Sequence, residues 1–96
     1  MDISAIKSKR VLVVGGTKQW QSVIRAEAPL FVFVPVDKLN FCLRVINSVD
    51  AVVLRADYIS HAQSKRICQK AKALGRRIIY GHQNKELFFN DLLAAI

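Results

Sequence analysis

Four short runs of apolar residues, separated by stretches with helical spacing, constrain the fold of this chain more than any other feature. The runs cover residues 11–14, 31–34, 51–54 and 78–80, and they are rich in β-branched side chains. A continuous apolar run of this length predicts a strand that is buried on both faces. The chain should therefore contain a sheet with helices packed against each of its sides.

The segments between these runs carry apolar residues three and four positions apart, as amphipathic helices do. We predict helices over about 20–27, 39–49, 60–75 and 84–95. Strands that alternate with helices need crossover connections, which are nearly always right-handed, so the strands should run parallel. The expected fold is an α/β/α sandwich with a four-stranded parallel sheet in the order 2-1-3-4. Residues 10–96 would form this single domain, after an N-terminal extension of residues 1–9.

Composition narrows the class of protein further. The chain has 96 residues, of which 52% are hydrophobic, so we expect a folded domain with one core rather than disorder. Its apolar runs are too short to span a bilayer, and its start lacks the apolar region of a secretory signal, which together predict a cytoplasmic protein without a membrane segment. Cys42 and Cys68 lack the spacing of a metal or redox motif, and we expect two free, buried thiols.

The chain is strongly basic, with 15 Lys or Arg against 7 Asp or Glu and a net charge of +8. Such an excess favours polyanions, acidic partners or phosphorylated ligands. No acidic residue lies between Asp57 and Glu86, and the exposed side of the third helix is basic. One predicted surface for a nucleic-acid backbone therefore consists of Lys65, Arg66, Lys70, Lys72, Arg76 and Arg77. Without a sequence-reading motif, this binding should be weak and nonspecific.

Ligands of an open parallel sheet bind at the carboxyl ends of its strands, near the point where the winding reverses. The first of these loops reads Gly15-Gly16-Thr17-Lys18. Two glycines let a ligand approach the backbone, and Thr17 can cap a helix whose N-terminus favours anions. The loop is neither a Walker A motif nor a dinucleotide fingerprint, so no cofactor is predicted. A tight turn that needs glycine for its shape is the alternative.

The loops after the other strands add polar residues to the same edge. Arg55 follows the third strand, and Ser60 and His61 open the third helix, where Ser60 can also serve as a cap. His82 follows the fourth strand and would approach His61 if those strands are neighbours, but nothing in the spacing with Asp57 demands a metal. Asp37 is expected to cap the second helix. The predicted ligand-binding residues are Gly15, Gly16, Thr17, Lys18, Arg55, Ser60, His61 and His82.

Four functions compete. The first is a regulatory or binding module for a phosphate-bearing small molecule or nucleotide at the carboxyl edge of the sheet. The second is nucleic-acid binding by the basic third helix, and the third is a homo-oligomeric interaction module. Phe41 and Val45 lie off the inward side of the second helix, which predicts a homodimer contact there. An enzyme ranks last, because no acid–base pair or activated nucleophile is visible.

Several segments resemble a bacterial family of small domains of unknown function, number 2325. These segments are residues 11–16, 50–54, 57–61 and 70–75. The resemblance rests on a strand leading into Gly15-Gly16 and on Ser60-His61 opening a Lys-rich helix. It implies a Rossmann-like or flavodoxin-like sandwich and no particular activity. Residues 27–30 depart from the family pattern, which usually has a glycine between the first helix and the second strand.

Overall fold

The computed structural model describes residues 4–35, 37–55 and 59–95 of the chain. Its centre is a four-stranded sheet in the order β2-β1-β3-β4, and every neighbouring pair of strands is parallel. The strands are β1 (Val11–Val14), β2 (Val32–Val34), β3 (Ala51–Leu54) and β4 (Arg77–Tyr80). The predicted fold class and strand order are confirmed.

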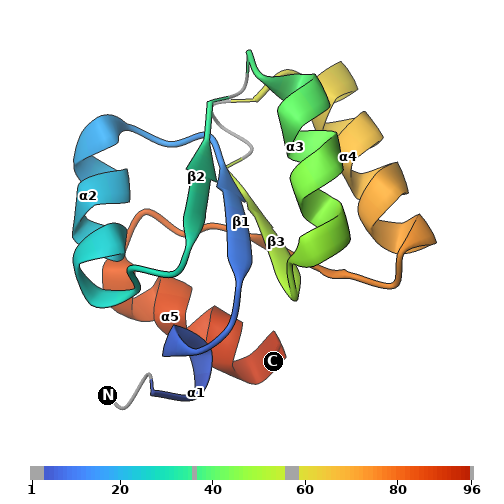
Figure 1. Ribbon diagram of the computed structural model, residues 1–96. Coiled ribbons are helices and arrows are strands. Elements are labelled where there is room, and N and C mark those ends of the chain that lie inside the picture. The colour runs from blue at the N-terminus through green and yellow to red at the C-terminus, as the bar shows by residue number, and fades with distance from the viewer. Residues whose placement is uncertain (1–3, 36, 56–58, 96) are drawn as a thin grey trace.

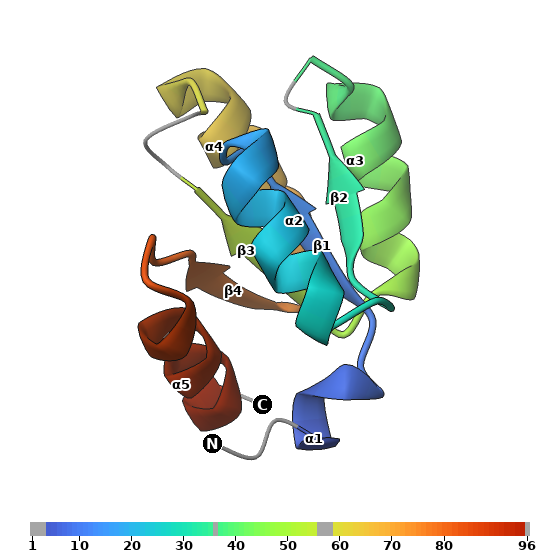
Figure 2. The same ribbon diagram turned by 90° about the vertical axis from the view of Figure 1, so that its left-hand side faces the viewer.

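Helices cover both faces of this sheet, as Figures 1 and 2 show. They are α1 (Ser4–Lys7), α2 (Lys18–Glu27), α3 (Leu39–Val45), α4 (His61–Ala73) and α5 (Lys85–Ala95), with a 3₁₀ turn, η1 (Ile46–Ser48), after α3. Helices α2 and α5 pack on one face together with α1, whereas α3 and α4 pack on the other. In the part of the chain that the structure describes, no helix combines the length and apolar character needed to cross a membrane.

Alternation of side chains along the central strands divides the core in two. Val11 and Val13 of β1 point into the layer under α2 and α5, whereas Leu12 and Val14 point into the layer under α3 and α4. All four residues are fully buried, as are the residues of β3. Burial on both faces is the reason why these strands read as continuous apolar runs.

Local sequence signals account for both ends of α4 but not for the start of α3. Ser60 caps α4, as predicted, and Gly75 follows the helix with a φ of +69°. The N–H groups of Gly75 and Arg76 donate to the carbonyls of Lys72 and Ala71, which closes the helix in a Schellman motif. The prediction that Asp37 caps the second predicted helix, which is α3 in the structure, was wrong. The residue before α3 is Lys38, whose side chain makes no capping hydrogen bond.

The predicted N-terminal extension contains helix α1. Its residue Ile6 is fully buried and belongs to the same core layer as Phe88 and Leu92 of α5. One apolar side chain in a four-residue helix is too short a pattern for periodicity to reveal. This short helix therefore covers part of the core layer beneath α5.

Candidate functional site

The hydrogen-bond ladder of the sheet continues one residue past the ends of the strands. The N–H of Arg55 donates to the carbonyl of Val14 (3.0 Å), and the N–H of Gly81 donates to the carbonyl of Leu54 (2.8 Å). Arg55 therefore lies between Gly15 and Gly81, one register step beyond the paired strands. Because side chains alternate along a strand, Arg55 extends to the face covered by α2 and α5.

Arg55 is a buried charged residue, only 4% exposed, and it stacks on Trp20 of α2. Its Cζ atom lies 4.5 Å from the centre of the Trp20 ring. The glycines beside this pair leave the space that it needs. A Cβ atom on Gly81 would lie 2.7 Å from Cδ of Arg55, and one on Gly16 would lie 2.7 Å from Cε3 of Trp20. The chain's own side chains thus fill the space beside two of its glycines.

The loop between β1 and α2 is held by side-chain hydrogen bonds. Thr17 Oγ1 accepts from the N–H of Trp20 (3.0 Å), so the predicted helix cap is confirmed. Gln21 Nε2 donates to the carbonyl of Gly15 (2.8 Å), which fixes the turn from the helix side. The N-terminus of a helix carries partial positive charge. This end of α2 and the guanidinium of Arg55 therefore bring two sources of positive potential to the same place.

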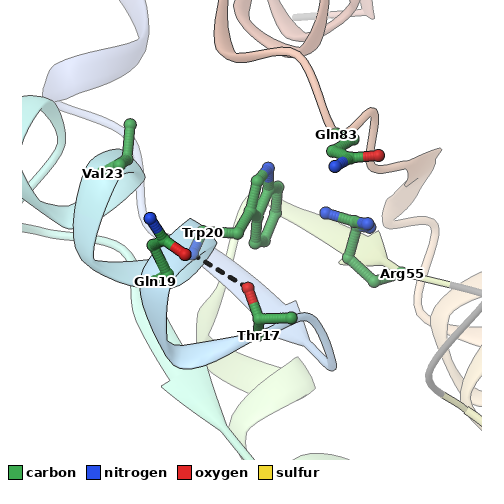
Figure 3. A pocket seen from close by; sticks show the side chains of 6 residues that line it. All are labelled: Thr17, Gln19, Trp20, Val23, Arg55 and Gln83. Atoms are coloured by element: carbon green, nitrogen blue, oxygen red, sulfur yellow. Dashed lines mark hydrogen bonds between the residues drawn. The ribbon is translucent and has the colours of Figure 1, made fainter.

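A pocket of about 280 Å³ opens here, which we call the Arg55 pocket (Figure 3). Its lining residues are Thr17, Gln19, Trp20, Val23, Arg55 and Gln83. Trp20 Nε1 donates to the carbonyl of His82 (3.1 Å), which holds the loop before α5 against α2. Hydroxyl, amide and guanidinium groups line the pocket, and none of the lining residues is acidic. Such groups can donate hydrogen bonds to an anion.

Lys18 belongs to a different depression. With Gly15, Gly16 and Arg25 it lines a pocket of about 510 Å³ that also includes Phe33 of β2. The two depressions lie on opposite sides of the N-terminal end of α2. The structure therefore brings Thr17 and Arg55 together but gives Lys18 other neighbours.

Ser60, His61 and His82 do not line the Arg55 pocket. Ser60 and Gln63 form a reciprocal capping box, with Ser60 Oγ accepting from Gln63 N (3.2 Å) and Gln63 Oε1 accepting from Ser60 N (3.1 Å). His61 is exposed at the start of α4, and Nδ1 of His82 accepts from the N–H of Asn84 (2.9 Å). Asp57 lies outside the described residues. Within residues 4–35, 37–55 and 59–95, no cluster of His, Cys, Asp and Glu could hold a metal ion.

The basic residues predicted to bind a nucleic-acid backbone differ in their exposure and in the elements that carry them. Lys65, Arg66 and Lys72 are exposed on α4, whereas Lys70 is half-buried and Arg77 lies in β4. Arg76 has a structural role, because its Nη2 and Nε atoms donate to the carbonyls of Asn47 (3.0 Å) and Ile46 (3.4 Å). The expected dimer contact stays a prediction. Phe41 is 48% exposed and Val45 is half-buried against the core.

Sequence reasoning missed four of the six residues that line the Arg55 pocket, namely Gln19, Trp20, Val23 and Gln83. Trp20 reads as an ordinary buried position of an amphipathic helix, and Gln83 as part of a connecting loop. The strand register carried a signal for this site. Arg55 directly follows the buried strand β3, and glycines directly follow the two strands that pair with it. Because glycine has no side chain, two glycines on the neighbouring strands leave room for one large side chain between them.

Comparisons of the chain with known protein families, with curated proteins and with solved structures found no match. Membership of family 2325 therefore stays a prediction, and the fold assignment rests on the observed sheet and its helices.

Proposed function

We propose that this chain is a binding module that recognises the phosphate group of a small molecule or nucleotide in the Arg55 pocket. One observation carries the proposal: a buried guanidinium and the N-terminus of α2 meet at one pocket. A guanidinium stays protonated at physiological pH. Because charges interact more strongly where water is excluded, it would attract an anion more than an exposed lysine does.

The groups around the pocket suit phosphate oxygens, which accept hydrogen bonds. Thr17 offers a hydroxyl, Gln19 offers an amide donor, and Figure 3 shows the amide of Gln83 beside Arg55. A volume of about 280 Å³ lies just below the usual range for ligand pockets, roughly 300–1,000 Å³. The pocket would therefore take a phosphate group and a small part of the attached molecule. Val23, 43% exposed at its rim, offers an apolar contact for the rest.

The position of the single tryptophan gives a direct test. Trp20 is the only tryptophan of the chain and stacks on Arg55, so its fluorescence reports on the pocket. Titration with inorganic phosphate should give a saturable change, with amide NMR shifts centred on Thr17 and Gln83. Arg55→Met should weaken binding about tenfold or more, because a hydrogen bond to a charged group contributes roughly 1.5–3 kcal/mol.

Two further variants test whether the Arg55 pocket itself binds phosphate. One changes an exposed residue of its lining, and the other removes a positive charge outside it. Gln83→Ala changes an exposed residue and should weaken phosphate binding about threefold without lowering stability. Arg25→Gln removes a positive charge from the same helix outside the Arg55 pocket and should leave affinity nearly unchanged. Equal losses in Arg25→Gln and Arg55→Met, or NMR shifts confined to distant residues, would contradict the proposal.

A further inference from the structure

Strand β2 lies at an edge of the sheet, between α2 on one side and α3 on the other (Figures 1 and 2). Two aromatic rings and four positive side chains surround this edge. We call them the β2 edge surface, and they are Lys18, Arg25, Phe33, Lys38, Phe41 and Arg44. This surface lines different pockets from the Arg55 pocket, and Arg66 of α4 shares an adjoining depression with Lys38, Phe41 and Arg44.

Each aromatic ring of the β2 edge surface has an arginine beside it. Cζ of Arg25 lies 4.7 Å from the centre of the Phe33 ring, and Cζ of Arg44 lies 5.9 Å from that of Phe41. Phe33 is half-buried, whereas Phe41 is 48% exposed. Flat apolar rings next to planar cations offer stacking surfaces and positive charge together.

The depressions on this surface adjoin one another. The pocket of about 510 Å³ beside Lys18 and Arg25 shares Phe33 and Pro35 with a pocket of about 490 Å³ that contains Lys38, Phe41 and Arg44. Neither has an acidic residue in its lining. A hollowed, positively charged path therefore crosses the edge of the sheet from α2 to α3.

Two nearby acidic residues do not cancel this charge. Glu27 is paired with Lys85 of α5, at 3.0 Å between Oε1 and Nζ. Asp37 lines an adjoining depression together with Lys38, Arg44 and Arg66. The path keeps an excess of positive charge along its length.

We propose that the β2 edge surface binds single-stranded nucleic acid. Sites for single strands combine aromatic rings, on which bases stack, with cations that follow the phosphates, and both are present here side by side. Phe41 is the more exposed ring and would carry most of the stacking. Lys38 and Arg44 would neutralise the phosphates on either side of that base.

Two other occupants fit these observations less well. An acidic peptide added as a further strand would gain few backbone hydrogen bonds, because β2 has three residues and Pro35 follows it. A second copy of the chain, docked about a two-fold axis through Phe41, would bring Lys38 and Arg44 near the same residues of its partner. Repulsion between like charges makes that contact costly.

The test uses a labelled oligouridylate of about ten nucleotides, within the roughly 4–16 that such sites cover, and fluorescence anisotropy at low salt. Phe41→Ala should weaken binding about tenfold, because stacking of one base contributes roughly 1–3 kcal/mol. Its salt dependence should not change, since no charge is removed. Lys38→Gln with Arg44→Gln should reduce the slope of log affinity against log salt by about 1.4, at roughly 0.7 for each phosphate contact on a single strand.

A matched control removes the same charge elsewhere. Lys65→Gln with Lys72→Gln neutralises two exposed residues of α4 that line neither pocket, and affinity should change less than twofold. Equal losses in the two double variants would overturn the proposal in favour of general attraction or of α4. Unchanged affinity in Phe41→Ala, or equally tight binding of a duplex of the same length, would overturn it too.

The remaining outcomes identify the other occupants. Displacement of the oligonucleotide by a polyglutamate peptide at the same charge concentration would favour an acidic partner and overturn the proposal. Sedimentation showing a dimer that Phe41→Ala dissociates would do the same in favour of a second copy. Arg55→Met should leave oligonucleotide affinity unchanged, so failure of the phosphate site and failure of this surface are distinguishable.

Discussion

The two faces of the sheet are packed with different kinds of side chain. Under α2 and α5 the layer is aromatic, with Trp20 against Phe88 and Phe88 against Phe89, each pair at 5.3 Å between ring centres. Under α3 and α4 it is aliphatic, with Ile46 and Ile67 typical of its members. The aromatic layer reaches the carboxyl edge of the sheet and stacks there on Arg55.

This difference explains where a ligand could enter. On the α3–α4 face, the capping box of Ser60 and Gln63 provides side-chain acceptors for backbone N–H groups at the start of α4. On the α2–α5 face, the helix starts beside a buried cation, and the loop before α5 is joined to α2 through the Trp20 hydrogen bond to His82. The start of α4 is thus closed by its own side chains, whereas the start of α2 borders the Arg55 pocket.

The largest expected effect tests how tightly the aromatic face is constrained. Gly16→Ala should destabilise the protein by about 3 kcal/mol, since it combines left-handed backbone strain of roughly 1–2 kcal/mol with overpacking of roughly 1–3 kcal/mol. Gly16 has a φ of +90°, and the added Cβ would lie 2.7 Å from the Trp20 ring. Urea unfolding followed by circular dichroism measures the loss.

Gly75→Ala is the control for that experiment on the other face. Gly75 has a φ of +69°, but no atom lies within 4 Å of a Cβ placed there. The substitution should therefore cost only the backbone strain, about 1 kcal/mol. Equal costs in the two variants would show that the stack of Trp20 and Arg55 does not limit the space beside Gly16.

The aliphatic face should make stability fall at high pH. Burial raises the pKa of the Cys42 thiol from 9.0 to about 11. The folded protein holds this proton more firmly than the unfolded chain, so the stabilisation is complete below about pH 9 and is lost as pH rises through 11. The loss should reach about 2 kcal/mol between pH 8 and pH 11, at roughly 1.36 kcal/mol for each unit.

Comparison with Cys42→Ala isolates this contribution. The variant lacks the thiol but retains every other group that titrates in this range. Its free energy of unfolding should therefore fall less steeply with pH than that of the wild type. Identical pH dependence in both proteins would mean that the α3–α4 layer admits enough water for the thiolate to form in the folded state.

Much of the fold could be predicted from the sequence because its signals are local. Burial on both faces makes β1 and β3 continuous apolar runs, and alternation with amphipathic segments makes the sheet parallel. Thr17 and Ser60 cap helices because a hydroxyl before a helix can accept an N–H of its first turn. The same preference failed at Asp37, because α3 begins one residue later and its first turn has no side-chain cap.

The site was less predictable, because it depends on register and on side-chain direction. The sequence places Arg55 and Lys18 at the same edge of the sheet, but their side chains line different pockets. His61 follows β3 closely in the chain, yet it starts a helix on the opposite face from the Arg55 pocket. The partnership of Trp20 and Arg55 connects residues far apart in sequence, so no local pattern records it.

The smallest expected effect compares the two helix caps. Thr17 Oγ1 accepts from the N–H of Trp20 at 3.0 Å, and Ser60 Oγ accepts from that of Gln63 at 3.2 Å. Replacing either hydroxyl residue by alanine removes one capping bond and should cost about 1 kcal/mol of stability. In Ser60→Ala, the bond from the Ser60 N–H to Gln63 Oε1 is retained, so this loss should be the smaller one.

Ligand binding should separate two variants that stability barely distinguishes. Thr17 lines the Arg55 pocket, so Thr17→Ala should weaken phosphate binding about threefold, the loss expected for one neutral hydrogen bond. Ser60→Ala changes the start of a helix on the other face and should leave phosphate affinity unchanged. Thr17→Ser keeps the hydroxyl and should bind like the wild type in the same Trp20 fluorescence titration. If Ser60→Ala loses as much affinity as Thr17→Ala, general loosening of the fold explains both, and the difference between the two faces does not determine where phosphate binds.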